Sequence, residues 1–420
     1  MIAKSRCAAA ALLAALVWPA AAYAGVVSAN GESVSFAAGS GETNHLHVTY
    51  GADSIAITDT GTPITAGPGC TSVTPEEAVC PVTALKLHVA LGDLNDSLVA
   101  TWTFGDGLCW VYMKGAPATR EARFDGGTGD DTLESAASGP CIVVEFLDGG
   151  PGDDLLTDGL GGPRTYLDGG PGADAFEGED ATVVYADRVN PITVTTDGVA
   201  NDGEIGEGDQ VPSEILMVIG GAAGDTIVGS NNVLGGPGDD TLTGGPETTG
   251  LSGGPGNDTI SVGASTWWNP WLEGDGGDDR LIGGSARDQG DYLYGGRGND
   301  TLIGLAGCDD LYGGGGNDII IGGEGSDRAS GNNGSDLLYG GRGADAIYGG
   351  ASRDRLFGGV GTDFLFARDL RSDRLDGGPG RDRAQINRGD IVRRTEALPP
   401  RLTEPGWMGA IPSGCYYTGS

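Results

Sequence analysis

The sequence is poor in the side chains from which most catalytic and zinc sites are built. It has three histidines in 420 residues, His45, His47 and His88, and none stands in an H-E-x-x-H pattern. His45 and His47 share one face of an expected strand, which leaves open a metal-binding pair or two inert surface histidines. We therefore interpret the chain as non-enzymatic. A secreted hydrolase with an unrecognised active site stays open as an alternative.

Basic residues and long apolar runs are also scarce. There are 24 Lys and Arg against 59 Asp and Glu, giving a net charge of -35. A chain this acidic repels phosphate backbones, which argues against nucleic acid as a partner, and it attracts cations. Beyond the first residues, no stretch reaches the roughly 18 apolar residues of a spanning helix. The sequence therefore predicts no membrane span.

The first 24 residues have the pattern of a secretory signal peptide. Lys4 and Arg6 form a basic start, residues 8–18 are almost wholly apolar, and Ala22-Tyr23-Ala24 offers small residues for cleavage before Gly25. An uncleaved anchor is the alternative. We expect a mature chain that is secreted and extracellular.

Glycine is abundant, with 80 residues of 420, against a usual share of roughly 7%. Collagen would need glycine at every third position, which is not the case here. Disorder and a repeat array remain as interpretations, and internal periodicity distinguishes them.

Two residue types recur in phase with a period of nine. Between residues 291 and 363, nine aspartates follow one another at intervals of nine residues. Two positions after each stands a mostly large apolar residue: Leu293, Leu302, Leu311, Ile320, Ala329, Leu338, Ile347, Leu356 and Leu365. Less regular copies, such as GGTGDDTLE at Gly126, begin at Gly149, Gly169, Gly220, Gly235, Gly253, Gly274 and Gly377.

Each nine-residue unit predicts a glycine turn followed by a short strand with one inward apolar side chain. One such strand buries almost nothing, but stacked strands bury a continuous ladder. If loops alternate between two edges, units 18 residues apart share an edge, and aspartates one strand spacing of about 4.8 Å apart repel each other. Calcium, which accepts carboxylate and carbonyl oxygens in flexible geometry, would reverse that repulsion better than magnesium.

These units resemble the hemolysin-type calcium-binding repeat, the RTX nonapeptide G-G-x-G-x-D-x-U-x, over roughly residues 126–385. The resemblance implies an all-β fold, a parallel β-roll (β-solenoid), with several Ca2+ ions held by the aspartate of position six and by loop carbonyls. The ligands it implies are Asp131, Asp154, Asp174, Asp225, Asp240, Asp258, Asp279, Asp291, Asp300, Asp309, Asp318, Asp327, Asp336, Asp345, Asp354, Asp363 and Asp382. Family members secreted by the type I route usually lack an N-terminal signal, unlike this chain.

The remaining segments complete the expected organisation. Residues 25–120 read as an N-terminal β cap region, residues 121–385 as the roll with insertions near 182–218 and 262–273, and residues 386–420 as a C-terminal cap or tail. The first insertion is rich in acidic residues, which leaves open an extra calcium site or a solvated loop. The second carries Trp267, Trp268 and Trp271.

Two further expectations concern partners and disulfides. The tryptophans of the second insertion either stack on sugars or pack over the roll, so an adhesin or carbohydrate-binding module is an alternative function, with a cell-surface or glycan partner. A disulfide between Cys70 and Cys80 is expected in an oxidising compartment, and Cys109 with Cys141 is a second candidate pair.

Overall fold

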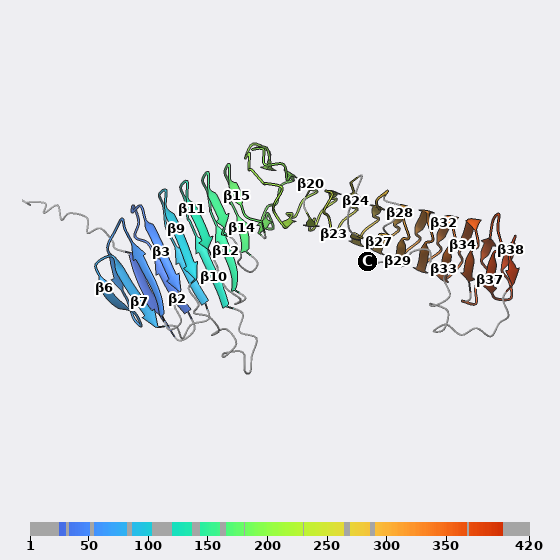
Figure 1. Ribbon diagram of the computed structural model, residues 1–420, viewed down its shortest axis with the longest axis horizontal. Coiled ribbons are helices and arrows are strands. Elements are labelled where there is room, and N and C mark those ends of the chain that lie inside the picture. Colours follow the sequence, from blue (N-terminus) through green and yellow to red (C-terminus); the bar gives the residue numbers. More distant parts are fainter. Residues whose placement is uncertain are drawn as a thin grey trace, which may run out of the picture.

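The protein is an elongated parallel β-solenoid, as a computed structural model shows (Figure 1). The structure describes residues 25–30, 33–50, 54–81, 86–102, 120–136, 143–159, 165–179, 181–229, 231–263, 269–285, 290–367 and 369–397. These residues form strands, turns and bends and contain no helix. The predicted all-β fold is confirmed. The signal peptide, Trp267, Trp268 and the pair Cys109–Cys141 lie outside the described residues.

One sheet, sheet A, runs along the whole solenoid with 19 strands. In spatial order these are β5 (Ile64–Ala66), β1 (Gly25–Ala29), β2 (Ser33–Ala37), β8 (Lys86–Ala90), β10 (Arg120–Asp125), β12 (Val143–Asp148), β14 (Thr165–Asp168), β16 (Thr182–Val184), β19 (Met217–Ile219), β21 (Asn232–Leu234), β23 (Gly250–Pro255), β25 (Trp271–Gly276), β27 (Tyr292–Arg297), β29 (Asp310–Gly315), β31 (Arg328–Asn333), β33 (Ala346–Ala351), β35 (Phe364–Ala367), β37 (Arg383–Ile386) and β39 (Glu396–Ala397).

Two shorter sheets share the opposite face. Sheet B comprises β6 (Thr71–Thr74), β7 (Glu77–Pro81), β4 (Ser54–Asp59), β3 (His45–Tyr50), β9 (Ser97–Trp102), β11 (Thr132–Ala136), β13 (Leu155–Asp158) and β15 (Ala175–Glu177). Sheet C comprises β18 (Gly203–Glu204), β17 (Ile192–Thr195), β20 (Thr226–Val228), β22 (Thr241–Gly244), β24 (Thr259–Val262), β26 (Arg280–Ile282), β28 (Thr301–Ala306), β30 (Ile319–Glu324), β32 (Leu337–Gly343), β34 (Arg355–Gly361), β36 (Arg374–Asp376) and β38 (Ile391–Arg393).

Two nonapeptide units make one turn of the solenoid. β27 pairs in parallel with β29, which places Leu293 opposite Leu311, and β28 pairs with β30. Consecutive units therefore lie in opposite sheets, and units 18 residues apart are neighbours in one sheet. This confirms the alternation of loops that the period predicts.

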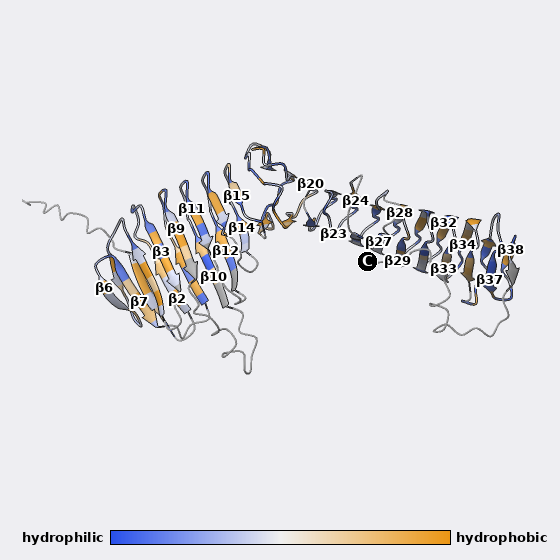
Figure 2. Cartoon of the chain, viewed as in Figure 1, coloured by the Kyte–Doolittle hydropathy of each residue, from blue (hydrophilic) through white to orange (hydrophobic). Residues whose placement is uncertain are grey.

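The core is a narrow double ladder of apolar side chains between the sheets. All nine apolar residues of the regular run, Leu293 to Leu365, are buried, because each is the single inward residue of its strand. Toward the N-terminus the inward side chains include Phe36 and Phe124, and the strands of this part are the more hydrophobic ones (Figure 2). The N-terminal part therefore buries more apolar surface per turn.

The N-terminal end closes with antiparallel strands. The segment 25–120, expected to be rich in strands, contains β2, β3, β4 and β8 among its strands. β3, β4, β7 and β6 pair antiparallel, and the predicted Cys70–Cys80 disulfide is present with an S–S distance of 2.07 Å. Cys308, in the regular run, is also disulfide-bonded.

Sheet A continues without a break through the predicted domain limit at residue 120, since β8 pairs with β10. At the other end β38 and β39 extend both sheets beyond residue 385. The domain limits stay predictions.

At the first insertion, sheet B ends and sheet C takes its place opposite sheet A. β16 stays in sheet A, whereas β17 and β18 begin sheet C. A parallel bridge from Ala175 to Gln210 lets the end of the insertion cover the last strand of sheet B. The solenoid thus crosses the insertion while the nonapeptide pattern is interrupted.

Candidate metal-binding edges

The loops of the solenoid form two edges. We call the first edge the loops that lead from a sheet A strand to sheet B or C, and the second edge the loops that return to sheet A. The first edge spans nearly the whole molecule. Among the described residues of the second edge, stacked aspartates begin at Asp291, just before β27.

Each edge carries one row of residues at the position just before the next strand. The first-edge row contains Asn44, Asp96, Asp131, Asp154, Asp174, Asp209, Asp225, Asp240, Asp258, Asp279, Asp300, Asp318, Asp336, Asp354, Asp373 and Asp390. The second-edge row contains Asp291, Asp309, Asp327, Asp345, Asp363 and Asp382. All seventeen aspartates implied by the resemblance are buried members of these two rows.

One carboxylate oxygen of each aspartate stacks the turns. In the second-edge row, the backbone N–H of Asp309 donates to Oδ1 of Asp327 at 3.0 Å, and that of Asp327 donates to Oδ1 of Asp345 at 2.9 Å. In the first-edge row, Asp318 donates to Asp336 at 2.8 Å. The side chain of one turn therefore caps the backbone of the turn before it.

The other carboxylate oxygen, Oδ2, is buried without a hydrogen-bond donor. This holds for Asp96, Asp131, Asp154, Asp174, Asp240, Asp258, Asp279, Asp300, Asp309, Asp318, Asp327, Asp336, Asp345, Asp354, Asp363, Asp373 and Asp382. A buried acceptor with no donor is costly, and a buried charge is more so. Such an oxygen is a natural ligand for a cation.

Glycine leaves room beside most of these oxygens, and in several turns a carbonyl of the next turn lies close by. A Cβ at Gly126 would lie 2.5 Å from Oδ2 of Asp131 and 2.6 Å from the carbonyl oxygen of Gly149, one turn further on. At Gly358 on the second edge, the same distances to Asp363 and to Gly377 are 2.5 and 2.6 Å. Two acceptors therefore converge on a space that only glycine leaves open, and the residues present fit a bound cation.

The first turn of the first-edge row has no pair of facing acceptor oxygens, because an asparagine replaces the aspartate. Asn44 takes the place of the aspartate, and its Nδ2 donates to the carbonyl of Leu91, the residue in the position of the first glycine of the next turn, at 3.1 Å. The amide supplies the donor that a carboxylate does not have. In the aspartate turns, a bound cation or a proton on the carboxylate would have to take the place of this donor between the two oxygens.

In two further aspartates, Asp225 and Asp291, the Oδ2 atom already accepts a hydrogen bond. Oδ2 of Asp225 accepts from the N–H of Gly221 at 2.7 Å, and Oδ2 of Asp291 accepts from the N–H of Gly284 at 2.6 Å. Each is the first aspartate of an unbroken run in its row, which continues from Asp225 to Asp240 and from Asp291 to Asp309. These two aspartates thus offer less to a cation than the interior ones.

The pKa values of most of the aspartates in the two rows are raised well above the usual value. Burial, reinforced by repulsion from neighbouring aspartates, raises the pKa of Asp327 and that of Asp174 to about 8, although a backbone hydrogen bond lowers each in part. Burial likewise raises the pKa of Asp300 and of Asp336 to about 7. Charged carboxylates are therefore unfavourable here unless a cation accompanies them.

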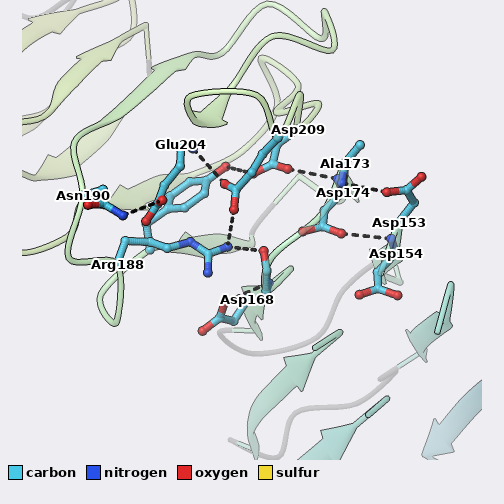
Figure 3. A network of polar contacts seen from close by, with 12 residues as sticks. Asp153, Asp154, Asp168, Ala173, Asp174, Arg188, Asn190, Glu204 and Asp209 are labelled. Atoms are coloured by element: carbon cyan, nitrogen blue, oxygen red, sulfur yellow. Dashed lines mark hydrogen bonds and ion pairs between the residues drawn. The ribbon is translucent and has the colours of Figure 1, made fainter. Parts of the chain in front are cut away.

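At the first insertion an arginine enters the first edge (Figure 3). Arg188 is buried, donates to the carbonyl of Gly170 through Nη2, and approaches Glu207 at 3.7 Å. Burial raises the pKa of both Asp168 and Asp209 to about 6, and the charge of Arg188 lowers it in part. The guanidinium is a permanent cation at the point where the repeat pattern is interrupted.

The acidic residues of this insertion are hydrogen-bonded internally. Asp209 accepts from the N–H of Asp174 and from the hydroxyl of Tyr185, each at 3.0 Å, and so joins the first-edge row. Asp202 accepts from the N–H groups of Thr195 and Val211. Two of the acids of the loop are thus buried structural groups, a third outcome beside the two that the sequence left open.

Sequence reasoning missed several members of the rows. Asp209 follows no glycine pair, Asp373 lies 19 residues after Asp354, and Asp390 belongs to no nonapeptide. Only Asp373 had a usable signal, since a one-residue shift of the period reaches it.

The candidate catalytic groups are not brought together. His45 and His47 are exposed on β3, and His88 lies on β8. Gly250 to Gly254 has the spacing of a G-x-S-x-G motif, but Ser252 stands in strand β23, where its hydroxyl donates to Asp275. β23 pairs with β21 and β25 in sheet A, whereas β3 belongs to sheet B and β8 lies toward the N-terminal end of sheet A.

The oxygen-only chemistry of the edges selects the kind of cation. Within the described residues, no three His, Cys, Asp or Glu side chains form a group that could hold a metal. A cation at either edge would be bound by a carboxylate oxygen and by backbone carbonyls, which suits a hard ion with flexible geometry.

Comparison with known protein families agrees with this chemistry. The model of the RTX calcium-binding nonapeptide repeat matches residues 219–246, 251–265, 271–290, 294–329 and 330–365. No curated protein matches the chain significantly. Among the described residues, none forms a helix long and apolar enough to cross a membrane.

Proposed function

Because residues 219–365 carry RTX calcium-binding nonapeptide repeats, we propose that this calcium-binding protein is secreted and folds in extracellular calcium to serve as a structural or cell-surface component. We propose the aspartates of the two rows with an open Oδ2 as its ligands. Asp225 and Asp291 would contribute more weakly. The first-edge row extends the proposed sites upstream of the matched repeats, to Asp96, Asp131, Asp154 and Asp174.

The observation that carries the proposal is the pairing of an open carboxylate oxygen with a glycine carbonyl of the next turn. At Gly126 the two oxygens are Oδ2 of Asp131 and the carbonyl oxygen of Gly149. A bound calcium ion would supply the positive charge between these acceptors. The protein contributes their spacing, through the Oδ1 hydrogen bonds that fix each turn on the next.

The charge of the rows couples calcium to folding. Two carboxylates at one strand spacing repel by about 3 kcal/mol at an effective dielectric of 20. A ligand that binds only the folded state stabilises it by mass action. Extracellular calcium modules bind at about 10⁻⁴ to 10⁻³ M, so the roll would stay open in a low-calcium cytoplasm and close outside.

The pattern of residues 1–24 supports export by the general secretory route, and the lack of an H-E-x-x-H pattern among the three histidines supports a non-enzymatic role. Both statements belong to the proposal. Identification of the mature N-terminus after expression in a secreting host would test the first.

A calcium titration of the purified mature protein tests the function. We expect circular dichroism to change to a β-type spectrum as calcium is added, with several ions bound per chain by metal analysis. Magnesium at the same concentrations is the control and should act weakly. A full β-type spectrum that is insensitive to EDTA, with no bound calcium, would refute the proposal.

A further inference from the structure

The outer face of sheet A carries three exposed aromatic side chains on two neighbouring strands. Trp271 of β25 is 54% exposed, and Tyr292 and Tyr294 of β27 are 47% and 39% exposed. Trp271 stands opposite Tyr292 in the strand register, and Tyr294 lies two residues further along the same face. The three rings therefore form one patch, which we call the aromatic patch.

The fold does not require a ring at the positions of Trp271 and Tyr292, whereas the register of Tyr294 holds a second tyrosine, Tyr312, on the next strand. At equivalent outer positions other turns carry Asn232, Gly250, Asp310 and Arg328, all in register with Trp271 and Tyr292. Large rings exposed together, where small or polar residues serve the roll equally well, mark a binding surface more often than scattered apolar residues do.

Polar groups lie beside the aromatic patch, and they are already hydrogen-bonded within the protein, Glu273 to Asp275 and Asp310 to Arg328. Glu273 stands opposite Tyr294 in the register and is half-buried. On the far side, Asp310 pairs with Arg328 at 2.9 Å. Gly250 stands opposite Trp271 in the register and places no side chain there.

This combination distinguishes between classes of partner. An acidic polymer is disfavoured by the net charge of -35. A second copy of this chain would have to desolvate Glu273 and the Asp310–Arg328 pair, and burying charges without matched partners is costly. An uncharged sugar chain fits better, because its C–H faces pack on aromatic rings while its hydroxyls donate to carboxylates.

The spacing of the rings also suits a sugar chain. Trp271 and Tyr292 are register partners on adjacent strands, so their backbones lie one strand spacing, about 4.8 Å, apart along the solenoid axis. A pyranose ring in an extended glycan has a similar length. Successive rings of one chain can thus meet successive strands.

We propose that Trp271, Tyr292, Tyr294 and Glu273 bind an uncharged extended polysaccharide on the outer face of sheet A. Its sugar rings stack on the three aromatic side chains, and its hydroxyls donate to Glu273. The site is separate from both calcium edges, but it needs the folded roll. Binding is therefore expected only in calcium.

The experiment measures binding of the calcium-loaded mature protein to cellohexaose, xylohexaose and mannohexaose, with polygalacturonate as the acidic comparison. Tryptophan fluorescence and calorimetry report the affinity. We expect at least one neutral hexasaccharide to bind, and Trp271→Ala or Tyr292→Ala to weaken it about tenfold. Tyr339→Ala, which removes a 37% exposed ring from the outer face of sheet C, is the matched control and should leave binding unchanged.

Several outcomes would overturn the proposal. These are no binding of any neutral hexasaccharide, binding of polygalacturonate alone, or equal effects of Trp271→Ala and Tyr339→Ala. Dimerisation that Trp271→Ala abolishes would assign the aromatic patch to a second copy instead. The calcium-induced circular dichroism of every variant is recorded in parallel, so a failure of folding is distinguished from a failure of sugar binding.

Discussion

The backbone amide of Asp327 donates a 2.9 Å hydrogen bond to Oδ1 of Asp345, one turn further along the second edge. Asp327 receives the same bond from Asp309. An interior aspartate therefore belongs to two interfaces between turns, whereas Asp382 ends the row and receives one bond, from Asp363.

Asp327→Asn should raise the calcium midpoint more, and remove more bound calcium, than Asp382→Asn. The asparagine keeps the size but removes the charge, and nearest-neighbour coupling makes an interior defect affect two interfaces. Asp318→Asn, interior on the first edge, should resemble Asp327→Asn. Calcium titrations followed by circular dichroism check this. Equal midpoints for the interior and terminal variants would show that the turns act independently.

Removal of calcium should unfold the two ends of the solenoid unequally. The segment 290–385 has aspartates on both edges and, in most strands, one large inward side chain, whereas strands of the N-terminal part bury two, such as Val34 and Phe36 of β2, and the described residues there stack aspartates on the first edge alone. In EDTA we expect hydrogen exchange to become fast in β27 to β37 while β2 to β13 stay protected. Uniform loss of protection along the chain would contradict this polarity.

Acidification should partly replace calcium. Burial raises the folded-state pKa of Asp327 to about 8 and those of Asp300 and Asp309 to about 7, above the usual value near 3.9 in an unfolded chain. The metal-free folded state then binds more protons than the unfolded one, so its stability is greatest at low pH and is lost as pH rises through about 7 to 8.

Metal-free protein should therefore gain β-type circular dichroism between about pH 8 and about pH 5, and the calcium midpoint should rise over the same range because protons compete with the ion. A metal-free spectrum that does not change with pH would argue against buried, coupled carboxylates.

Asn44→Asp should make the first turn of the first-edge row dependent on a bound ion, because the wild-type turn pairs its polar groups through the Asn44 amide. The variant loses the donor to the carbonyl of Leu91 and faces it with a second acceptor. In EDTA we expect the free energy of unfolding of the N-terminal part to fall by about 1–3 kcal/mol. Saturating calcium should restore part of it. Thermal unfolding with and without calcium measures both, and a loss that calcium does not reduce would indicate a purely steric effect.

Arg188→Gln should destabilise the junction of sheets B and C even in saturating calcium. It leaves Glu207 and the acids around Asp168 without their permanent cation, and breaking a buried charge pair costs about 3–5 kcal/mol. The matched control is Arg394→Gln, since Arg394 pairs with Asp376 but is 60% exposed, and exposed pairs contribute about 0–1 kcal/mol. Similar melting temperatures for the two variants would show that Arg188 is not needed in the row.

The period of nine by itself determined the strands, the inward apolar ladder and the two edges of the regular run, because a short strand with one inward residue has only one way to bury it. It also placed Asp300, Asp318, Asp336 and Asp354 on one edge and the intervening aspartates on the other, as their hydrogen bonds confirm.

Only the tertiary structure decided how the rows extend and end. Asp96 stacks on Asp131 and Asp174 on Asp209, each across 35 residues, because a loop of any length can leave the edge between two strands as long as the strands stay in register. Sequence spacing then loses the period that the backbone keeps. For the same reason, the amide of Asn44 and the guanidinium of Arg188 appear among the carboxylates only once the turns are stacked.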